Sequence, residues 1–243
     1  MTYRYYMKKN VQFIFLLTIV LCVFFFHVMQ GELGSEIVHT YWVMFNERRF
    51  LSIYLSLFLC SLIPYMKRIF CVDYVTRFPS KWVFLEKLCL RIFLIAIIYS
   101  LLLTFGWYGI VGPRVGGENN AMFLKSLAFI FLGNMIGWME VGLLEVFLYS
   151  LIHNVLLAFV FCYAGAISMN LSLYTMRSEQ FTRYIRLYDF MYHPEIFKTK
   201  YDYVSVTFFH IVVIFLIFLL CHERIKRHDY VKGGKCINER QKE

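Results

Sequence analysis

The chain has 243 residues, of which 60% are apolar, 20% aromatic and 17% charged, and its net charge is +9. Soluble domains contain about 45–50% apolar and about 25% charged residues. The composition therefore excludes an ordinary soluble domain, a collagen-like or disordered chain and a disulfide scaffold, and it indicates an integral membrane protein.

Six apolar blocks follow one another along the chain. A helix rises about 1.5 Å per residue, so about 20 apolar residues cross a hydrocarbon layer of about 30 Å. Backbone that faces lipid must satisfy its own hydrogen bonds, which predicts helices and not open strands. We expect an all-α, polytopic transmembrane helical bundle that forms one domain, with spans at residues 11–29, 51–66, 88–107, 122–138, 146–169 and 203–221.

A basic and aromatic segment precedes the first block. Such a segment is typical of a helix that lies along the inner membrane face. A secretory signal is the alternative, but the block is long and no small-residue cleavage motif follows it, so we expect an uncleaved span. The predicted interfacial residues are Arg4, Tyr5, Tyr6, Lys8 and Lys9.

The connection between the second and third blocks, residues 67–87, is also basic and aromatic. Its cations suit lipid head groups or an acidic protein surface, and Phe78 and Trp82 suit burial at an interface. Pro79 can open the helix that leads into the third span. An interfacial anchor without a protein partner is the alternative. The residues singled out are Arg77, Phe78, Pro79, Ser80, Lys81, Trp82 and Lys87.

The apolar stretch at residues 121–169 is too long for one crossing, because 49 residues of helix would extend about 74 Å. Glu140 and Glu145 lie near its middle, so we expect an inner hairpin at residues 137–144 between the fourth and fifth spans. Carboxylates at a membrane border suit a cation or a basic partner. Five residues apart on a helix they share no face, which argues against a paired-carboxylate site.

Two histidines fall inside predicted spans, His153 in the fifth and His210 in the sixth. Polar side chains at membrane depth usually face the bundle interior or a cavity, so both are candidates for a path or gate. Hydrogen bonding between helices is the favoured interpretation of each. An intramembrane enzyme that uses either histidine is a third, weaker hypothesis.

Residues 178–192 have apolar side chains at helical spacing and follow the fifth block. The pattern predicts a short amphipathic helix that lies on the outer leaflet or dips into it. Phe181 and Tyr184 belong to its apolar face. Such a helix gates an exit path or simply covers the bundle.

Lysine and arginine set the orientation, because they are enriched on the cytoplasmic side. With the N-terminus inside, sixteen of them fall on the inner side and eight on the outer side. We therefore expect both termini in the cytoplasm of a multi-pass cell-membrane protein. The basic inner rim explains the net charge through contact with anionic lipid, and no nucleic-acid partner is expected.

Several motifs of chemistry are missing from the sequence. It contains no P-loop, no G-x-S-x-G, no H-E-x-x-H and no C-x-x-C. We expect no catalytic residues, no metal and no directly bound cofactor, so the chain is not predicted to be an enzyme.

The layout resembles the membrane permease subunit of six-span ABC-type exporters of the second export class. Members of that family begin with a basic interfacial helix, carry a basic loop between spans two and three, and place an outer helix between spans five and six. The segment Arg77-Phe78-Pro79-Ser80-Lys81-Trp82, followed by Lys87, resembles the start of span three in small permeases of bacteriocin or peptide export and immunity systems.

The resemblance implies a separate ABC ATPase subunit that binds ATP and contacts the basic loop. It also implies a second permease subunit, in a homodimer or a heterodimer, and a path for a peptide or amphipathic substrate. The alternative is a non-transporting accessory or immunity protein that binds a partner within the bilayer. The identity of the cargo is not encoded in any motif of the sequence.

Overall fold

The computed structural model describes residue 41 and residues 45–69, 78–111, 120–172, 186–192 and 200–227. All regular secondary structure within these ranges is helical, which confirms the predicted all-α class. The predicted first span and the basic helix before it lie outside the described residues, as do Arg77, Phe181 and Tyr184.

The first described helical run has three parts. It begins with α3 (Glu47–Arg49), continues as the π-helix η1 (Phe50–Leu55) and ends with α4 (Ser56–Ile69). The Asn46 side chain caps its start by accepting a hydrogen bond from the Arg49 N–H at 2.9 Å. This run contains the predicted span at residues 51–66 and extends beyond it at both ends.

The second run also contains a π-helical segment. It consists of α6 (Lys81–Leu101), the π-helix η2 (Leu102–Gly106) and α7 (Trp107–Val111). The Ser80 hydroxyl caps α6 by accepting from the Val83 N–H at 3.2 Å. The predicted third span, residues 88–107, lies within this run.

Four further helices complete the described chain. They are α8 (Asn120–Ile152), α9 (Val155–Ser172), the short α11 (Leu187–Tyr192) and α12 (Lys200–Arg227). At about 1.5 Å per residue, the 33 residues of α8 extend about 50 Å, which exceeds the hydrocarbon thickness of about 30 Å. One helix therefore occupies most of the stretch that we expected to divide.

The predicted hairpin at residues 137–144 is wrong. The helix α8 continues through it, and its chain reversal lies at His153 and Asn154. This part of α8 serves packing instead: a Cβ added at Gly142 would lie 2.6 Å from Cγ2 of Ile92 on α6. Glu140, for its part, forms a hydrogen bond with another helix. Glycine and glutamate near the middle of an apolar stretch thus marked helix contacts and not a surface turn.

Three described helical stretches are long and apolar enough to cross a membrane, namely Lys81–Gly109, Ser126–Ile152 and Asp202–Arg227. A fourth apolar helix, Val155–Ser168, is shorter. The protein is accordingly a helical membrane protein, as the composition indicated.

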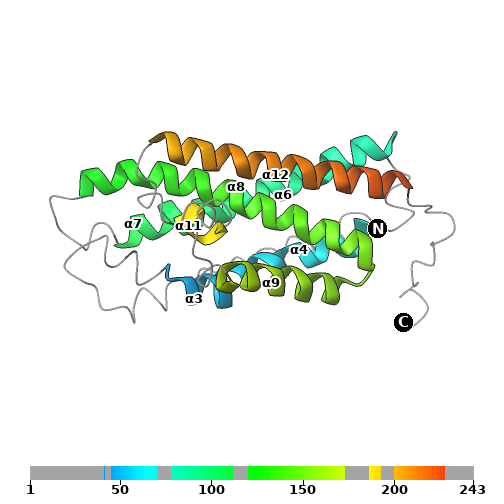
Figure 1. The fold of residues 1–243 in the computed structure, drawn as a ribbon, viewed down its shortest axis with the longest axis horizontal. Coiled ribbons are helices and arrows are strands. Elements are labelled where there is room, and N and C mark those ends of the chain that lie inside the picture. Colours follow the sequence, from blue (N-terminus) through cyan, green and yellow to red (C-terminus); the bar gives the residue numbers. More distant parts are fainter. Residues whose placement is uncertain are drawn as a thin grey trace, which may run out of the picture.

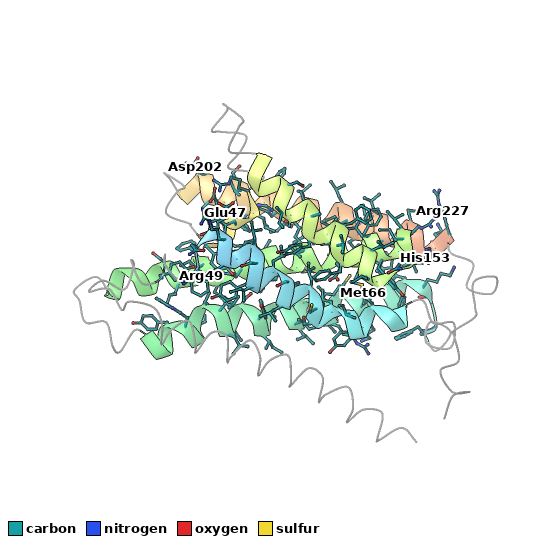
Figure 2. All side chains as sticks on the ribbon, turned by 90° about the horizontal axis from the view of Figure 1, so that it is seen from below. Glu47, Arg49, Met66, His153, Asp202 and Arg227 are labelled. Atoms are coloured by element: carbon teal, nitrogen blue, oxygen red, sulfur yellow. The ribbon has the colours of Figure 1, made fainter. Side chains whose placement is uncertain are left out.

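The long helical runs that follow one another in the chain alternate in direction, which gathers their termini at two ends of the bundle (Figure 1). As a result α8 and α12, which pack on each other, run parallel. One end holds Glu47, Arg49 and Asp202, and the opposite end holds Met66, His153 and Arg227 (Figure 2). Contacts along the bundle agree with this order: the Tyr203 hydroxyl donates to the Phe129 carbonyl at 2.8 Å, near the starts of α12 and α8. We call the end with Glu47, Arg49 and Asp202 the α11 end, and the end with Met66, His153 and Arg227 the α12-tail end.

A cluster of aromatic rings fills the core towards the α11 end. Trp138 of α8 is fully buried and its ring lies 4.7 Å from Phe58 and 5.1 Å from Tyr99, centroid to centroid. The Tyr99 hydroxyl donates to the carbonyl of Tyr54 in the π-helix η1 at 2.9 Å. The cluster joins the first and second runs, α8 and α11. Its buried rings are Tyr41, Phe45, Phe50, Tyr54, Phe58, Tyr99, Trp107, Trp138, Tyr188 and Tyr192.

Candidate functional site

The short helix α11 is inserted among the longer helices. All five residues from Tyr188 to Tyr192 are buried, and the helix lies against α8 (Figure 1). We expected an amphipathic helix over residues 178–192 that lies on the outer leaflet or dips into it. The described part of that segment has no exposed face, because it is enclosed by α8, α12 and the aromatic cluster. Of the two positions predicted for this segment, on the leaflet or dipping into it, the burial of residues 188–192 agrees better with the second.

Two glycines on α8 make room for α11. A Cβ at Gly133 would lie 2.6 Å from the Phe190 carbonyl oxygen, and a Cβ at Gly137 would lie 2.5 Å from the Met191 sulfur. Any larger residue at Gly133 would press on backbone, which cannot move aside as a flexible side chain does. The two form a G-x-x-x-G pattern, a known signal for close helix approach in membranes. The sequence carries this signal, but none of the predicted site residues included the glycine pair.

Between these glycines, Asn134 holds the backbone of α11. Its side-chain Nδ2 donates to the Met191 carbonyl at 3.1 Å and to the Ile130 carbonyl at 2.9 Å. Asn134 is fully buried, and its Oδ1 has no hydrogen-bond partner among the described residues. One acceptor of the amide is therefore left unused beside α11.

The predicted candidates Glu140 and His210 meet across the interface of α8 and α12. His210 Nδ1 lies 2.7 Å from Glu140 Oε2, and the histidine is 1% exposed. The imidazole stacks on the Phe190 ring of α11, with centroids 4.3 Å apart and planes at 23°. Its Nε2 is buried and has no partner in the described part of the chain. Helix-to-helix hydrogen bonding was the favoured interpretation of His210 and is confirmed.

Phe190 is held from a second side by Tyr203 of α12. The two rings are stacked, with centroids 5.7 Å apart and planes at 26°. Tyr203 is fixed in turn by its hydrogen bond to the Phe129 carbonyl. We call the five residues that enclose Phe190 and Met191 the α11 seat: Gly133, Asn134 and Gly137 of α8, and Tyr203 and His210 of α12.

Polar contacts tether the start of α11 to the beginning of the first helical run. Arg186 NH2 lies 3.5 Å from Oε2 of Glu47, and Arg186 NH1 lies 2.9 Å from Oδ2 of Asp189. The Tyr188 hydroxyl donates to the Phe45 carbonyl at 2.5 Å. These contacts lie outside the α11 seat and hold the helix from its other side.

Glu145, the other predicted carboxylate, does not join Glu140. It is 0% exposed, and neither carboxylate oxygen has a hydrogen-bond partner among the described residues. The separation of the two glutamates onto different faces of α8 agrees with the helical spacing. The sequence did not reveal that Glu145 is enclosed.

His153 lies at the chain reversal after α8, and its predicted position within a span is wrong. Its backbone φ is +57°, the left-handed region, and its side chain is exposed. Asn154 starts α9, with Oδ1 accepting from the N–H groups of Leu156 at 3.0 Å and Leu157 at 3.2 Å. His153 is thus a turn residue, and it contributes nothing to the α11 seat.

The predicted coupling segment surrounds the start of α6. Ser80 is the cap of α6, so Pro79 lies one residue before the cap and not in the first helical turn. Lys81 Nζ donates to the Lys226 carbonyl at the end of α12, at 2.9 Å. The Trp82 ring is 48% exposed and lies 4.9 Å from His222 and 5.5 Å from Phe218.

The rest of that segment divides between the core and the surface. The Phe78 ring packs 5.4 Å from Phe84, whereas Lys87 is exposed. The α12-tail end therefore presents basic and aromatic side chains on the first turns of α6 and on the last turns of α12.

Charge is distributed unequally between the two ends. Among side chains that the structure describes, the α12-tail end has six cations and two carboxylates, whereas the α11 end has three of each. The six cations are Lys81, Lys87, Arg91, Arg224, Lys226 and Arg227. Arg224 also links helix ends, since its Nε donates to the Ser150 carbonyl at 3.3 Å.

No metal site is formed by the described residues, in which histidine, cysteine and acidic side chains make no group of three able to hold an ion. No known protein family, no curated protein and no solved structure matches the chain. Its function is therefore inferred from the geometry of the α11 seat and of the two bundle ends.

Proposed function

We propose that this chain is the membrane permease subunit of an ATP-driven exporter, which works with a separate ATPase subunit and a second permease subunit. Its cargo is a peptide or another amphipathic molecule. The observation that supports this proposal best is the re-entry of α11, between the fifth and sixth proposed spans, into one end of the bundle.

Six spans follow from this proposal with revised bounds. Residues 11–29 form the first, and the run from α3 to α4 forms the second. The run from α6 to α7 is the third, and α8, α9 and α12 are the last three. The alternating directions of the five described runs are compatible with six crossings.

The charge distribution supports a cytoplasmic position for the α12-tail end, because lysine and arginine concentrate on that side of a membrane. The α11 end then faces outward, and both termini of the chain lie in the cytoplasm. In this orientation α11 closes the outer end of the path. Release of α11 opens that end to the cargo.

The basic and aromatic residues at the start of α6 form the proposed ATPase contact. Lys81 contacts the end of α12. A displacement of this segment by the ATPase would therefore move α12 as well as α6. Arg77 belongs to the same segment by sequence.

Charge reversal tests the contact. We expect Arg77→Glu with Lys81→Glu to abolish co-purification of an ATPase and to leave membrane insertion unchanged. Arg48→Glu with Arg49→Glu, at the α11 end, is the matched control and should leave co-purification intact. Equal ATPase recovery with both double variants would refute the coupling role, and the absence of any ATPase from the wild-type preparation would favour the accessory protein.

A further inference from the structure

The α11 seat is built from groups that recognise peptides in general. Asn134 donates to a backbone carbonyl, Gly133 allows backbone to approach within contact distance, and an aromatic side chain lies between two rings. Each contact is made to a feature that many peptides share, namely a carbonyl group and an aromatic ring.

The occupant leaves part of the hydrogen-bonding capacity of the seat unused. Asn134 Oδ1 and His210 Nε2 are both buried, and neither has a partner within the described residues. A buried polar atom without a partner costs roughly 1–3 kcal/mol. A ligand that offers an N–H to Asn134 and a polar hydrogen or acceptor to His210 would satisfy both, which α11 does not.

The occupant is also a poor helix by itself. α11 has six residues, and isolated helices shorter than about 12 residues are marginal in water. Its conformation is maintained by the seat and by the Arg186 and Tyr188 tethers. A competing segment therefore has to replace a limited set of contacts.

From this geometry we infer that the α11 seat is a peptide-binding site, and that α11 is its tethered internal occupant. The ligand is a peptide segment with an aromatic side chain, which takes the place of Phe190 between Tyr203 and His210. The existence of the site does not depend on the proposed function. The identification of its ligand with the exported cargo does.

The test measures peptide binding to the purified full chain in lipid nanodiscs. The probe is a fluorescent, end-blocked heptapeptide with the sequence of residues 186–192, and the matched probe has alanine in place of its phenylalanine. Arg186→Ala removes a tether that lies outside the seat. Apparent affinity scales with the fraction of open sites, so we expect the phenylalanine probe to bind this variant about tenfold more tightly than wild type.

Two further variants define the site. Addition of His210→Ala to Arg186→Ala should remove the gain in affinity for the phenylalanine probe. Addition of Phe208→Ala, which changes an exposed residue of the same helix, should preserve that gain. The alanine probe should bind none of these proteins more tightly than wild type.

Hydrogen exchange in α11 reports whether Arg186→Ala loosens the helix. If hydrogen exchange in α11 is unchanged in Arg186→Ala, the binding test uses Phe190→Ala instead. This variant empties the space between Tyr203 and His210 directly. Equal binding of both probes to an opened variant, or no gain in binding when α11 is released, overturns the inference. A lipid occupant would give that second result.

The outcomes are independent of the ATPase. Probe binding without ATPase co-purification would support the site and refute the exporter. ATPase co-purification without probe binding would support the exporter and refute the site.

Discussion

Individual buried polar residues explain how α8 remains one helix. Glu140 is satisfied by His210 across the bundle, and Asn134 donates to the backbone of α11. A polar side chain inside a bundle is tolerated where a partner meets it. Glu145 differs, because the described residues offer its oxygens no hydrogen bond.

Glu145 provides the first prediction. Replacement of a buried unpartnered carboxyl group by an apolar side chain of similar volume removes its desolvation cost. We expect Glu145→Met to keep or raise the midpoint of thermal unfolding, whereas Glu145→Ala leaves a cavity and lowers it. Glu145→Ala should lower the free energy of unfolding by roughly 2–4 kcal/mol, by analogy with other large-to-small core changes. Circular dichroism during heating in detergent makes the measurement, and a strong loss with methionine would reveal a required partner.

His153 provides the second prediction. Its positive φ is unfavourable for a side chain with a Cβ and costs about 1 kcal/mol or more, whereas glycine adopts it freely. His153→Gly should therefore raise the unfolding midpoint slightly and leave peptide binding unchanged. Asn154→Ala, which removes the cap of α9, should lower the midpoint by the equivalent of about 1 kcal/mol. A lower unfolding midpoint for His153→Gly than for Asn154→Ala would contradict the turn assigned to these two residues.

At the scale of elements, the docking of α11 depends on the glycine pair of α8. Close approach at Gly133 involves backbone, so a methyl group there displaces the shorter element. The long helix is fixed by its own hydrogen bonds and by packing along its length. Strain introduced at this contact therefore falls on α11.

A third prediction follows from that contact. Gly133→Ala should raise hydrogen exchange in residues 187–192, because the added Cβ would clash with the Phe190 carbonyl. Gly165→Ala is the matched control, since a Cβ at Gly165 on α9 would meet nothing within 4 Å. Mass spectrometry of exchanged peptides gives the readout. Similar exchange of α11 in both variants would mean that the contact at Gly133 does not hold the helix.

At the scale of the whole molecule, charge differs between the two ends of the bundle. Among the side chains that the structure describes, the α12-tail end carries a surplus of cations, and the α11 end carries equal numbers of cations and carboxylates. Because the chain reversal at Asn154 belongs to the basic end, the orientation of the bundle can be tested there and at the start of α3.

The fourth prediction concerns this orientation. A cysteine introduced at Asn154, in a variant whose native cysteines are replaced, should react with a membrane-impermeant maleimide only after the cells are opened. A cysteine at Arg48 should react in intact cells. Labelling of Asn154→Cys from outside would reverse the orientation and place the proposed ATPase contact on the wrong side.

Of the five residues of the α11 seat, the sequence singled out only His210. His210 was singled out because polar residues are rare at membrane depth, Glu140 because it lay at the expected hairpin near the membrane border, and residues 178–192 because of their helical pattern. Their association was not predicted, since residues 70 positions apart meet only through the packing of α8 on α12. The misplaced hairpin has the same origin, because a glutamate within an apolar stretch suits a turn until a packing partner is known.

Composition and block length by themselves determined that the protein is a helical membrane protein, because apolar stretches of this length are stable only within a bilayer or a bundle core. The helix caps Ser80 and Asn154 also depend on local sequence, because each side chain accepts hydrogen bonds only from N–H groups two or three residues further along the chain. The tertiary structure decided where α8 ends, that α11 lies inside the bundle, and which carboxylate has a partner. Each of these depends on contacts between segments distant in sequence, and such contacts outweigh the weak local preferences of glycine, glutamate and histidine.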